Sequence, residues 1–297
     1  MVKTSLASIA CFVEKYNFTD PKEAKALQNF KIAAETMGHG FDFMFRENIL
    51  AIPKYDAVFI RATTDPLFTA YIVSKTAWEL GLKVVDDPKS IQICGNKIHL
   101  YELFKKYDIP HIPTVFLTKN ELHHKRILDI FRNFGRPVVV KAPYTSFSKY
   151  VEKVACETSF RDVAKRFFRK SDVLVVQKFM PSAFDWRVGV LNGEVLYVCK
   201  YMVPKGRWKH GAKRRGKPSF IWGRTISLKR ENAPVKLKET ALKACEVVGS
   251  GLYGVDIKEI NGDYIVVEVN DNPSIYAGHE DLRDKDVYSK IVAYLVD

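Results

Sequence analysis

Cysteine and paired histidine are scarce in this sequence. Five cysteines occur, at positions 11, 94, 156, 199 and 245, and no two of them form a CxxC pair. An odd number without such spacing argues against a disulfide framework and against a cysteine zinc site, and it predicts a reducing, cytoplasmic location. None of the seven histidines is paired at the spacing of metal ligands. No stretch approaches the roughly 18 uninterrupted apolar residues that a membrane span needs.

The composition is that of a globular chain with an excess of basic residues. Apolar residues make up 47% and charged residues 27% of the 297 positions, close to the usual ~45–50% and ~25%, so disorder, collagen and coiled coil are poor interpretations. Lys and Arg number 47 against 34 Asp and Glu, a formal net charge of +13. Such a charge concerns partners rather than fold. It favours a polyanionic ligand such as nucleotide phosphates, an acidic peptide, nucleic acid or a membrane surface.

The first third of the chain alternates predicted helices and strands. Residues 21–37 carry apolar positions at helical spacing, and Asp20 followed by proline is a suitable helix start. Short apolar strands are predicted at 55–61 and 83–85, on either side of a helix over 66–80. Strand, helix and strand in this order predict a parallel βαβ unit.

The rest of the chain is typical of an α+β region rich in antiparallel hairpins. Asn192-Gly193 is a strong hairpin signal, and a second hairpin is predicted over 253–269 around Asn261-Gly262. Helices are predicted over 96–107 and 234–249. Further strands are predicted at 114–117, 137–141, 173–177, 185–191 and 194–203.

Lys141 is placed where a lysine can meet phosphate oxygens. The apolar run from Val138 to Val140 delivers it to the end of a strand, and a loop of small polar residues follows with Ser146 and Ser148. A lysine there can bind phosphate as a point charge, and loop amides and hydroxyls can cradle it. Alone the pattern is weak, because a lysine that ends a strand is usually just solvated.

A second segment offers backbone groups to an adenine ring. The strand from Val173 to Gln177 begins with four apolar residues and runs into the linker Lys178-Phe179-Met180. A buried strand that leads into an exposed linker presents its amide and carbonyl groups at the edge of the sheet. The alternative is an ordinary core strand with no ligand.

Acidic residues within two late strands suggest a metal site. Asp256 lies in one apolar strand, and Glu268 and Asn270 lie in the next. Burying an unpaired carboxylate is costly, and a bound divalent cation removes that cost. Glu268 and Asn270 are two residues apart and so project from one face, and their oxygens suit Mg²⁺, particularly when phosphates complete its shell. The alternative is two carboxylates on the wet face of a half-exposed hairpin.

If Asp256 and Glu268 bind one cation together, the register of that hairpin is constrained. Asp256 and Glu268 must lie on one face, and direct opposition of the two requires a loop with an odd number of residues. The metal hypothesis therefore predicts a three-residue loop over 261–263. The commoner two-residue Asn-Gly turn would pair Asp256 with Val267 and send Glu268 to the other face, unless a bulge elsewhere restores the register.

In this order, the three segments resemble the ATP-grasp ligases, most closely the RimK-type and glutathione-synthetase-type branch. The resemblance covers about residues 55–280. Each motif is moderately specific alone, and their order and spacing together are strongly so. The motifs are Asp87-Pro88-Lys89-Ser90-Ile91, Asn96-Lys97, Ile109-Pro110, Asp185-Trp186-Arg187-Val188, Gly254-Val255-Asp256-Ile257, Val267-Glu268-Val269-Asn270 and Pro273-Ser274.

This resemblance implies an ATP-grasp fold of mixed α/β and α+β class, with a small N-terminal βαβ domain and a two-lobed nucleotide-binding unit. The N-terminal domain is expected over 1–88 and the ATP-grasp domain over 89–297. Its lid lobe would take about 112–180 and its metal-bearing lobe about 181–297. ATP would lie between the two lobes.

The resemblance also implies roles for individual residues. Arg187 and Lys200 would face the transferred phosphoryl group. Asp256, Glu268 and Asn270 would ligate one or two Mg²⁺ ions, with Mn²⁺ as a substitute. Contacts to the phosphates, adenine or ribose of ATP would come from Lys97, Lys141, Ser146, Ser148, Gln177, Lys178, Phe179, Met180 and Asp185.

The activity that the resemblance implies is ATP-dependent ligation of a carboxylate to an amine, such as adding an amino acid to a peptide, a protein or a small acid. The carboxylate would attack the γ-phosphate to form an acyl phosphate, and the amine would then displace phosphate. Positioning and charge neutralisation suffice for such a reaction. No nucleophilic side chain is required, in keeping with the lack of a convincing Cys–His or Ser–His pair.

Two departures from the family pattern keep other functions open. The phosphate loop at 144–150 contains no glycine, although the family's loop is usually glycine-rich, and a basic insert occupies 204–223. One alternative is a kinase-like transfer to a hydroxyl group. Another is a module that binds nucleic acid or an acidic protein and has a degenerate ATP site. The insert favours an acidic peptide or protein as partner, and no membrane partner is expected.

Overall fold

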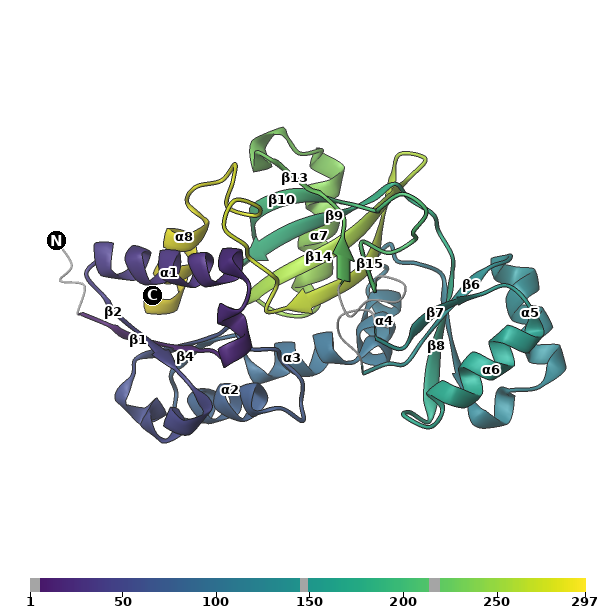
Figure 1. Cartoon of the computed structure of the whole chain (residues 1–297), viewed down its shortest axis with the longest axis horizontal. Helices are drawn as coiled ribbons and strands as arrows, with labels where there is room; N and C mark the ends of the chain where they lie inside the picture. The colour runs from purple at the N-terminus through teal and green to yellow at the C-terminus, as the bar shows by residue number, and fades with distance from the viewer. Residues whose placement is uncertain (1–5, 145–148, 214–219) are drawn as a thin grey trace.

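The chain folds around three main sheets that follow one another along the sequence (Figure 1). The computed structural model describes residues 6–144, 149–213 and 220–297. Within these ranges, a four-stranded N-terminal sheet, a four-stranded lid sheet and a five-stranded central sheet are accompanied by a two-stranded ribbon. No helix in this part of the chain is long and apolar enough to cross a membrane.

The N-terminal sheet is parallel, with strand order β2-β1-β3-β4, which confirms the predicted βαβ unit. Asp20 begins its first helix as predicted, since its side chain accepts hydrogen bonds from two backbone amides of the first turn. The elements are β1 (Ser8–Phe12), α1 (Pro21–Thr36), β2 (Gly40–Met44), β3 (Ala57–Ile60), α2 (Thr69–Glu79) and β4 (Lys83–Val85), with short 3-10 turns at Lys15–Phe18 and Arg46–Lys54.

The lid sheet is antiparallel, with strand order β5-β8-β6-β7. Two helices cover one of its faces, where Val140 and Val176 meet Ile127 and Phe160 in a core of their own. Strand residues alternate between faces, so Lys141 and Gln177 point away from that core. The elements are β5 (Thr114–Thr118), a 3-10 turn (Lys119–Glu121), α5 (His124–Phe134), β6 (Val138–Lys141), β7 (Val151–Val154), α6 (Glu157–Phe167) and β8 (Val173–Lys178).

The central sheet is also antiparallel, with strand order β13-β10-β9-β14-β15. Its buried face carries Trp186, Val188 and Ile257, which pack with α4 and α7. The elements are α3 (Pro88–Gly95), α4 (Lys97–Lys106), β9 (Phe184–Leu191), β10 (Glu194–Met202), β11 (Gly211–Lys213), β12 (Phe220–Trp222), β13 (Thr225–Leu228), a 3-10 turn (Arg230–Asn232), α7 (Val235–Glu246), β14 (Leu252–Ile260) and β15 (Asp263–Asp271).

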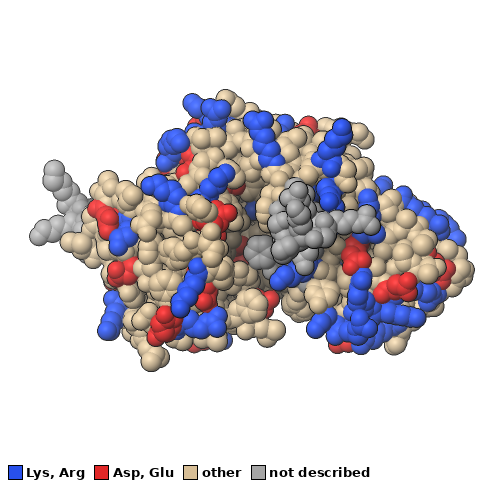
Figure 2. Space-filling model, in the orientation of Figure 1, with Lys and Arg blue, Asp and Glu red and all other residues tan. Residues whose placement is uncertain are grey.

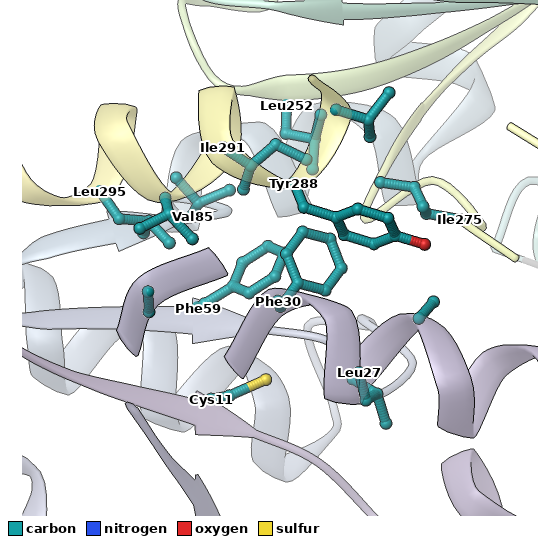
Figure 3. Close-up of a cluster of buried hydrophobic side chains, with 14 of the residues drawn as sticks. Cys11, Leu27, Phe30, Phe59, Val85, Leu252, Ile275, Tyr288, Ile291 and Leu295 are labelled. Carbon is teal, nitrogen blue, oxygen red and sulfur yellow. The ribbon is translucent and has the colours of Figure 1, made fainter. Parts of the chain in front are cut away.

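The last helix, α8 (Val287–Val296), returns to the N-terminal sheet. Its Tyr288 ring meets Phe30 of α1 at 4.8 Å between centroids, and Phe30 meets Phe59 of β3 at 4.9 Å. Figure 3 shows these rings between α8 and the sheet, with Ile291 beside them. The domain boundaries at 88 and 180 stay predictions. The helix α8 packs on the N-terminal sheet and also meets Leu191 and Leu252 of the central sheet, so it lies between the N-terminal sheet and the lobe to which the sequence assigned it.

The loop of the hairpin β14–β15 has two residues, so the predicted three-residue loop is wrong. Ile260 pairs with Asp263 across the turn. Asn261 and Gly262 have φ angles of 52° and 84°, the positive values that a type I′ turn requires of both central residues. Local turn preference therefore prevails at the tip.

A β-bulge then restores the register that a shared cation needs. The pairing shifts between Ile257, which faces Val266, and Asp256, which faces Glu268. Val267 is the extra residue of this bulge. A two-residue turn separates Asp256 from Glu268 unless a bulge follows it. This bulge is present, and it brings Asp256 and Glu268 to the same face of the sheet.

Candidate active site

The acidic residues predicted as metal ligands come together on one face of the central sheet. Asp256 on β14 pairs with Glu268 on one side and with Arg187 of β9 on the other. The side-chain amide of Asn270 donates to Oδ2 of Asp256 (3.2 Å) and to the carbonyl of Gly254 (3.2 Å). Four of the predicted site residues therefore share a single patch that faces away from α7.

Arg187 donates two parallel hydrogen bonds to the carboxylate of Asp256. Nε lies 2.7 Å from Oδ1 and Nη2 lies 3.0 Å from Oδ2, in side chains that are only 12% and 16% exposed. Burial raises the pKa of Asp256 to about 6, and Arg187 opposes that rise, so the carboxylate is mainly ionised at pH 7. Gly254 makes room for the arginine, because a Cβ there would lie 2.9 Å from Nη1.

Lysines from two other elements supply positive charge beside Glu268. Lys97 is the first residue of α4 and Lys141 the last of β6, and both are buried. The amide of Lys97 donates to the carbonyl of Pro143 (3.2 Å), which links α4 to the end of β6. Burial works against ionised Glu268, but Lys97, Lys141 and Arg187 outweigh it and hold its pKa below the ordinary value. Burial likewise lowers the pKa of Lys141 to about 8.

The hydroxyl of Tyr101 holds the bulge of the metal hairpin. Tyr101 is 2% exposed and donates to the carbonyl of Val267, the residue left out of the strand pairing. It lies four residues after Lys97 in α4, one turn along the same side of the helix. One helix therefore positions both a site lysine and the bulge that aligns Glu268.

The predicted adenine linker lies at the edge of the lid sheet, where β8 ends. Gln177 is buried and its side-chain amide donates to the hydroxyl of Thr114 (2.9 Å). The amide of Lys178 donates to the carbonyl of Pro113 (3.0 Å), so this N–H already serves the sheet. This bond occupies the amide of Lys178 but not its carbonyl, so the Lys178 carbonyl and the backbone of Phe179 and Met180 remain the predicted partners of a base edge.

Asp185 takes part in an ion pair that the sequence analysis did not anticipate. Lys258 reaches it at 2.5 Å, and Ser182 donates to it at 2.8 Å. Lys258 is two residues after Asp256 and so shares its face of β14, a relation that strand alternation could have revealed. The Lys258 charge also helps to lower the pKa of Lys141, so the pair of Asp185 and Lys258 lies near the lysines that surround Glu268.

The structure argues against the role predicted for Lys200. In the pairing of β9 with β10, Lys200 faces Trp186 and not Arg187, so the strand pleat puts it on the other face of the sheet. Its ammonium lies 4.2 Å from the ring centroid of Phe184 and 4.5 Å from that of Trp186. We therefore correct this assignment: Lys200 covers aromatic rings and does not lie with Arg187.

Ser146 and Ser148, predicted to hold phosphate, lie outside the described residues. The basic insert is described on both sides of residues 214–219. Its Trp208 ring meets Phe179 of the adenine linker at 5.9 Å, and Lys209 donates to the carbonyl of Val151 in β7 (2.6 Å). The insert thus leaves the central sheet after β10 and contacts the lid lobe.

The acidic patch fits a hard divalent cation. Two carboxylates and an amide oxygen are ligands that Mg²⁺ accepts, and the amide nitrogen of Asn270 is already used, which leaves its oxygen as an acceptor. In the described part of the chain no three His, Cys, Asp or Glu side chains cluster in a way that could hold a metal. An incomplete protein shell suits Mg²⁺ that substrate phosphates also bind.

Comparison with known proteins agrees with this geometry. Residues 94–295 match the RimK-like ATP-grasp domain. The chain is 23% identical over 285 residues to the glutamate–LysW ligase ArgX of Sulfolobus acidocaldarius, covering 92% of each protein. It is 24% identical over 249 residues to a probable alpha-L-glutamate ligase of Pseudoalteromonas atlantica, covering 83% of this chain and 78% of the relative.

Solved structures share the fold at lower sequence identity. D-alanine–D-alanine ligase from Bacillus anthracis superposes with a TM-score of 0.72 at 16% identity, covering 98% of this chain and 96% of that one. An ATP-grasp RimK domain protein from Sphaerobacter thermophilus has a TM-score of 0.71 at 17% identity, covering 97% and 99%. These likenesses confirm the predicted ATP-grasp fold, and the domain match covers more than half of the sequence. The chain therefore belongs to the RimK-like ATP-grasp family, a family of ATP-dependent ligases that join carboxylates to amines.

Proposed function

We propose that this protein is an ATP-dependent carboxylate–amine ligase that adds an amino acid to an acidic acceptor. A carboxylate oxygen of the acceptor attacks the γ-phosphorus, and the bond to the β–γ bridging oxygen breaks to release ADP. The amine nitrogen then attacks the acyl carbon, phosphate leaves, and the amine loses a proton. The observation that carries this proposal is the meeting of Arg187, Lys97 and Lys141 around Asp256 and Glu268.

The basic side chains of the site contact different parts of ATP. Lys97 of α4 and Lys141 of the lid sheet bind phosphate oxygens, and Arg187 neutralises charge on the transferred group. The backbone of Lys178 to Met180 holds the adenine, and Asp185 lies toward the ribose. This arrangement needs no covalent intermediate on the protein, because positioning and charge neutralisation account for phosphoryl transfer.

Asp256, Glu268 and Asn270 are the proposed ligands for one or two Mg²⁺ ions, with Mn²⁺ as a substitute. A metal held by these residues would supply positive charge that offsets the charge of the ATP phosphates. Besides neutralising the transferred group, Arg187 keeps Asp256 oriented and ionised, since its guanidinium holds both carboxylate oxygens. Glu268 is kept ionised by its lysine neighbours, which is the form a metal requires.

Glutamate is the amino acid that we propose as the amine substrate, supported by the names of the two relatives. An acidic peptide or protein is proposed as the acceptor, supported by the exposed Lys205 and Arg207 of the insert. Lys and Arg side chains also gather along the lower edge of the lid lobe, at the right of the molecule (Figure 2). The insert also contains Arg214, Arg215 and Lys217, which lie outside the described residues.

Mass spectrometry of reaction products tests the proposal. The chain is incubated with MgATP, L-glutamate and a pool of peptides that end in glutamate, and we expect peptides heavier by one glutamyl residue with one ADP for each bond formed. A phosphorylated peptide or amino acid would support a kinase instead. No MgATP binding, together with salt-sensitive binding of nucleic acid, would support a binding module.

We propose the cytoplasm as the compartment. The five cysteines are free thiols, and three of them, Cys11, Cys199 and Cys245, are buried. Unpaired cysteines of this number persist most readily where the environment is reducing. Alkylation of the denatured protein immediately after cell lysis, which leaves only disulfide-bonded cysteines unmodified, tests whether the compartment is reducing.

A further inference from the structure

We propose that His210 positions Arg187 for phosphoryl transfer through the ring of Tyr201, and that contacts of the same insert with the lid lobe control this position. The proposal rests on the function proposed above and concerns its regulation. It assigns to residues 208–210 the task of linking lid closure to the arginine. His210 is a positioning residue here, because it touches Tyr201 rather than the reacting atoms.

Tyr201 connects the arginine to the insert. The Cζ atom of Arg187 lies 5.1 Å from the centroid of the Tyr201 ring, a distance at which an aromatic face attracts a cation. The imidazole of His210 stacks on the same ring, with centroids 4.6 Å apart and planes 17° from parallel. The hydroxyl of Tyr201 donates to buried Glu280 at 2.6 Å. Because Glu280 holds the hydroxyl end of Tyr201, a displacement of His210 tilts the ring on which Arg187 lies.

His210 is itself fixed at the root of the insert. Its Nδ1 lies 3.1 Å from the carbonyl of Met202, and because a carbonyl can only accept, Nδ1 carries the proton. Burial lowers the pKa of this imidazole, so the ring is neutral at pH 7 and does not repel Arg187. The amide of Gly223 donates to the backbone carbonyl of His210 (2.9 Å), which closes the base of the insert.

The two preceding residues touch the other lobe. Trp208 meets Phe179 edge to face at 5.9 Å, and the ammonium of Lys153 lies 4.5 Å from the Phe179 centroid and 5.6 Å from that of Trp208. Lys209 donates to the carbonyl of Val151 at 2.6 Å. Trp208, Lys209 and His210 are consecutive, so one short segment contacts the lid lobe at one end and Tyr201 at the other.

This connection gives a physical reason for ATP cleavage to depend on the closed lid. Movement of the lid away from the central sheet pulls Trp208 and Lys209 with it or breaks their contacts. Either event disturbs the stacking of His210 on Tyr201. The arginine then loses part of the surface that orients it, and small misplacements of a charge-neutralising group reduce rate strongly.

Single-turnover cleavage of MgATP by the full chain, with L-glutamate and a peptide that ends in glutamate, tests the inference. We expect His210→Ala to lower the cleavage rate about tenfold, equivalent to ~1.4 kcal/mol, while the affinity for MgATP stays within about twofold. His210→Phe keeps an aromatic ring on Tyr201 and should recover most of the rate. The exposed His99, changed to Ala, is the matched control and should behave like the wild type.

A double-mutant cycle distinguishes a linked segment from two unrelated defects. Trp208→Ala should also lower the rate about tenfold, and the Trp208→Ala/His210→Ala double variant should be no slower than either single one. A product of the two effects, about a hundredfold, would overturn the link. If His210→Ala does not fold, His210→Leu fills the same space without an aromatic ring and takes its place in the cycle, with the same expected loss.

The failure of this inference differs from the failure of the proposed function. A wild-type chain that forms the glutamyl peptide while His210→Ala cleaves MgATP at the normal rate contradicts the inference alone. So does a His210→Ala variant that loses MgATP affinity in proportion to rate, or one that Phe does not rescue. A wild-type chain that cleaves no MgATP under these conditions contradicts both.

Discussion

Removing the hydroxyl of Tyr101 should weaken the metal site without touching a ligand. In the wild type this hydroxyl donates to the carbonyl of Val267, the residue that the bulge leaves unpaired in the hairpin. Tyr101→Phe leaves that carbonyl without its partner, which costs about 1–3 kcal/mol. The loss falls on the bulged register and not on the regular one, in which Asp256 would face Val267. The variant therefore favours the register that separates Asp256 from Glu268.

Two measurements follow from this reasoning. The free energy of unfolding, from urea denaturation, should fall by about 1–3 kcal/mol. The Mg²⁺ concentration for half-maximal ATP cleavage should rise by up to about tenfold, since each 1.4 kcal/mol lost from the bulged register lowers its ratio to the regular register tenfold and the apparent affinity follows the populated fraction.

Tyr253→Phe is the matched control for Tyr101→Phe. Tyr253 is also fully buried, and its hydroxyl lies 2.7 Å from that of Ser90 and accepts from the amide of Gly251, away from the bulge. Its loss should lower stability by a similar amount and leave the Mg²⁺ requirement unchanged. Equal shifts in the Mg²⁺ requirement for the two variants, or none for Tyr101→Phe, would refute the argument.

Four further outcomes are expected. Lys141→Ala should weaken MgATP binding about tenfold or more, with little change in thermal stability, and unaltered affinity measured by calorimetry would remove Lys141 from the site. Because burial lowers the pKa of Lys141 to about 8, its charge is lost as pH rises through that value, so MgATP affinity should fall above pH 8 in the wild type and stay level in Lys141→Arg; an identical pH profile for both would count against this. Glu268→Gln should abolish turnover with Mg²⁺, whereas Glu239→Gln on the exposed side of α7 should not, and normal turnover in the first would remove the metal assignment. Changing Lys205 and Arg207 to Ser should raise the KM for an acidic peptide about tenfold and flatten its salt dependence; a fall in MgATP affinity instead would assign the insert to the nucleotide site.

Local patterns in the sequence predicted most of the elements because each depends on near neighbours. The cap at Asp20 and the apolar run before Lys141 are settled by residues a few positions away. The two-residue turn at Asn261-Gly262 is also set locally, and the three-residue loop predicted there was wrong because it gave the metal hypothesis precedence over turn preference. The bulge at Val267 is different, because the hydroxyl that holds its carbonyl comes from Tyr101, far away in the sequence. Turn preferences alone showed that a bulge could align Asp256 with Glu268, but they could not predict that the bulge forms.

The sequence analysis also placed one side chain on the wrong face of the sheet. Lys200 follows Cys199, which faces Arg187 across the sheet, yet the pairing of Lys200 with Trp186 turns it to the opposite face. The same alternation could have found Lys258, two residues beyond Asp256. The return of α8 to the N-terminal sheet could not be found this way, since Tyr288 and Phe30 are brought together only by the tertiary fold.

The transfer of oxygen from the acceptor to phosphate tests the central claim most directly. The peptide carboxylate is labelled with ¹⁸O and incubated with the chain, MgATP and L-glutamate, and the released inorganic phosphate is analysed by mass spectrometry. An acyl-phosphate route predicts one ¹⁸O atom in each phosphate released with a peptide bond, because the acyl carbon–oxygen bond breaks in the second step. Glutamyl peptide formed with unlabelled phosphate, or phosphate retained on a product, would contradict the ligase mechanism.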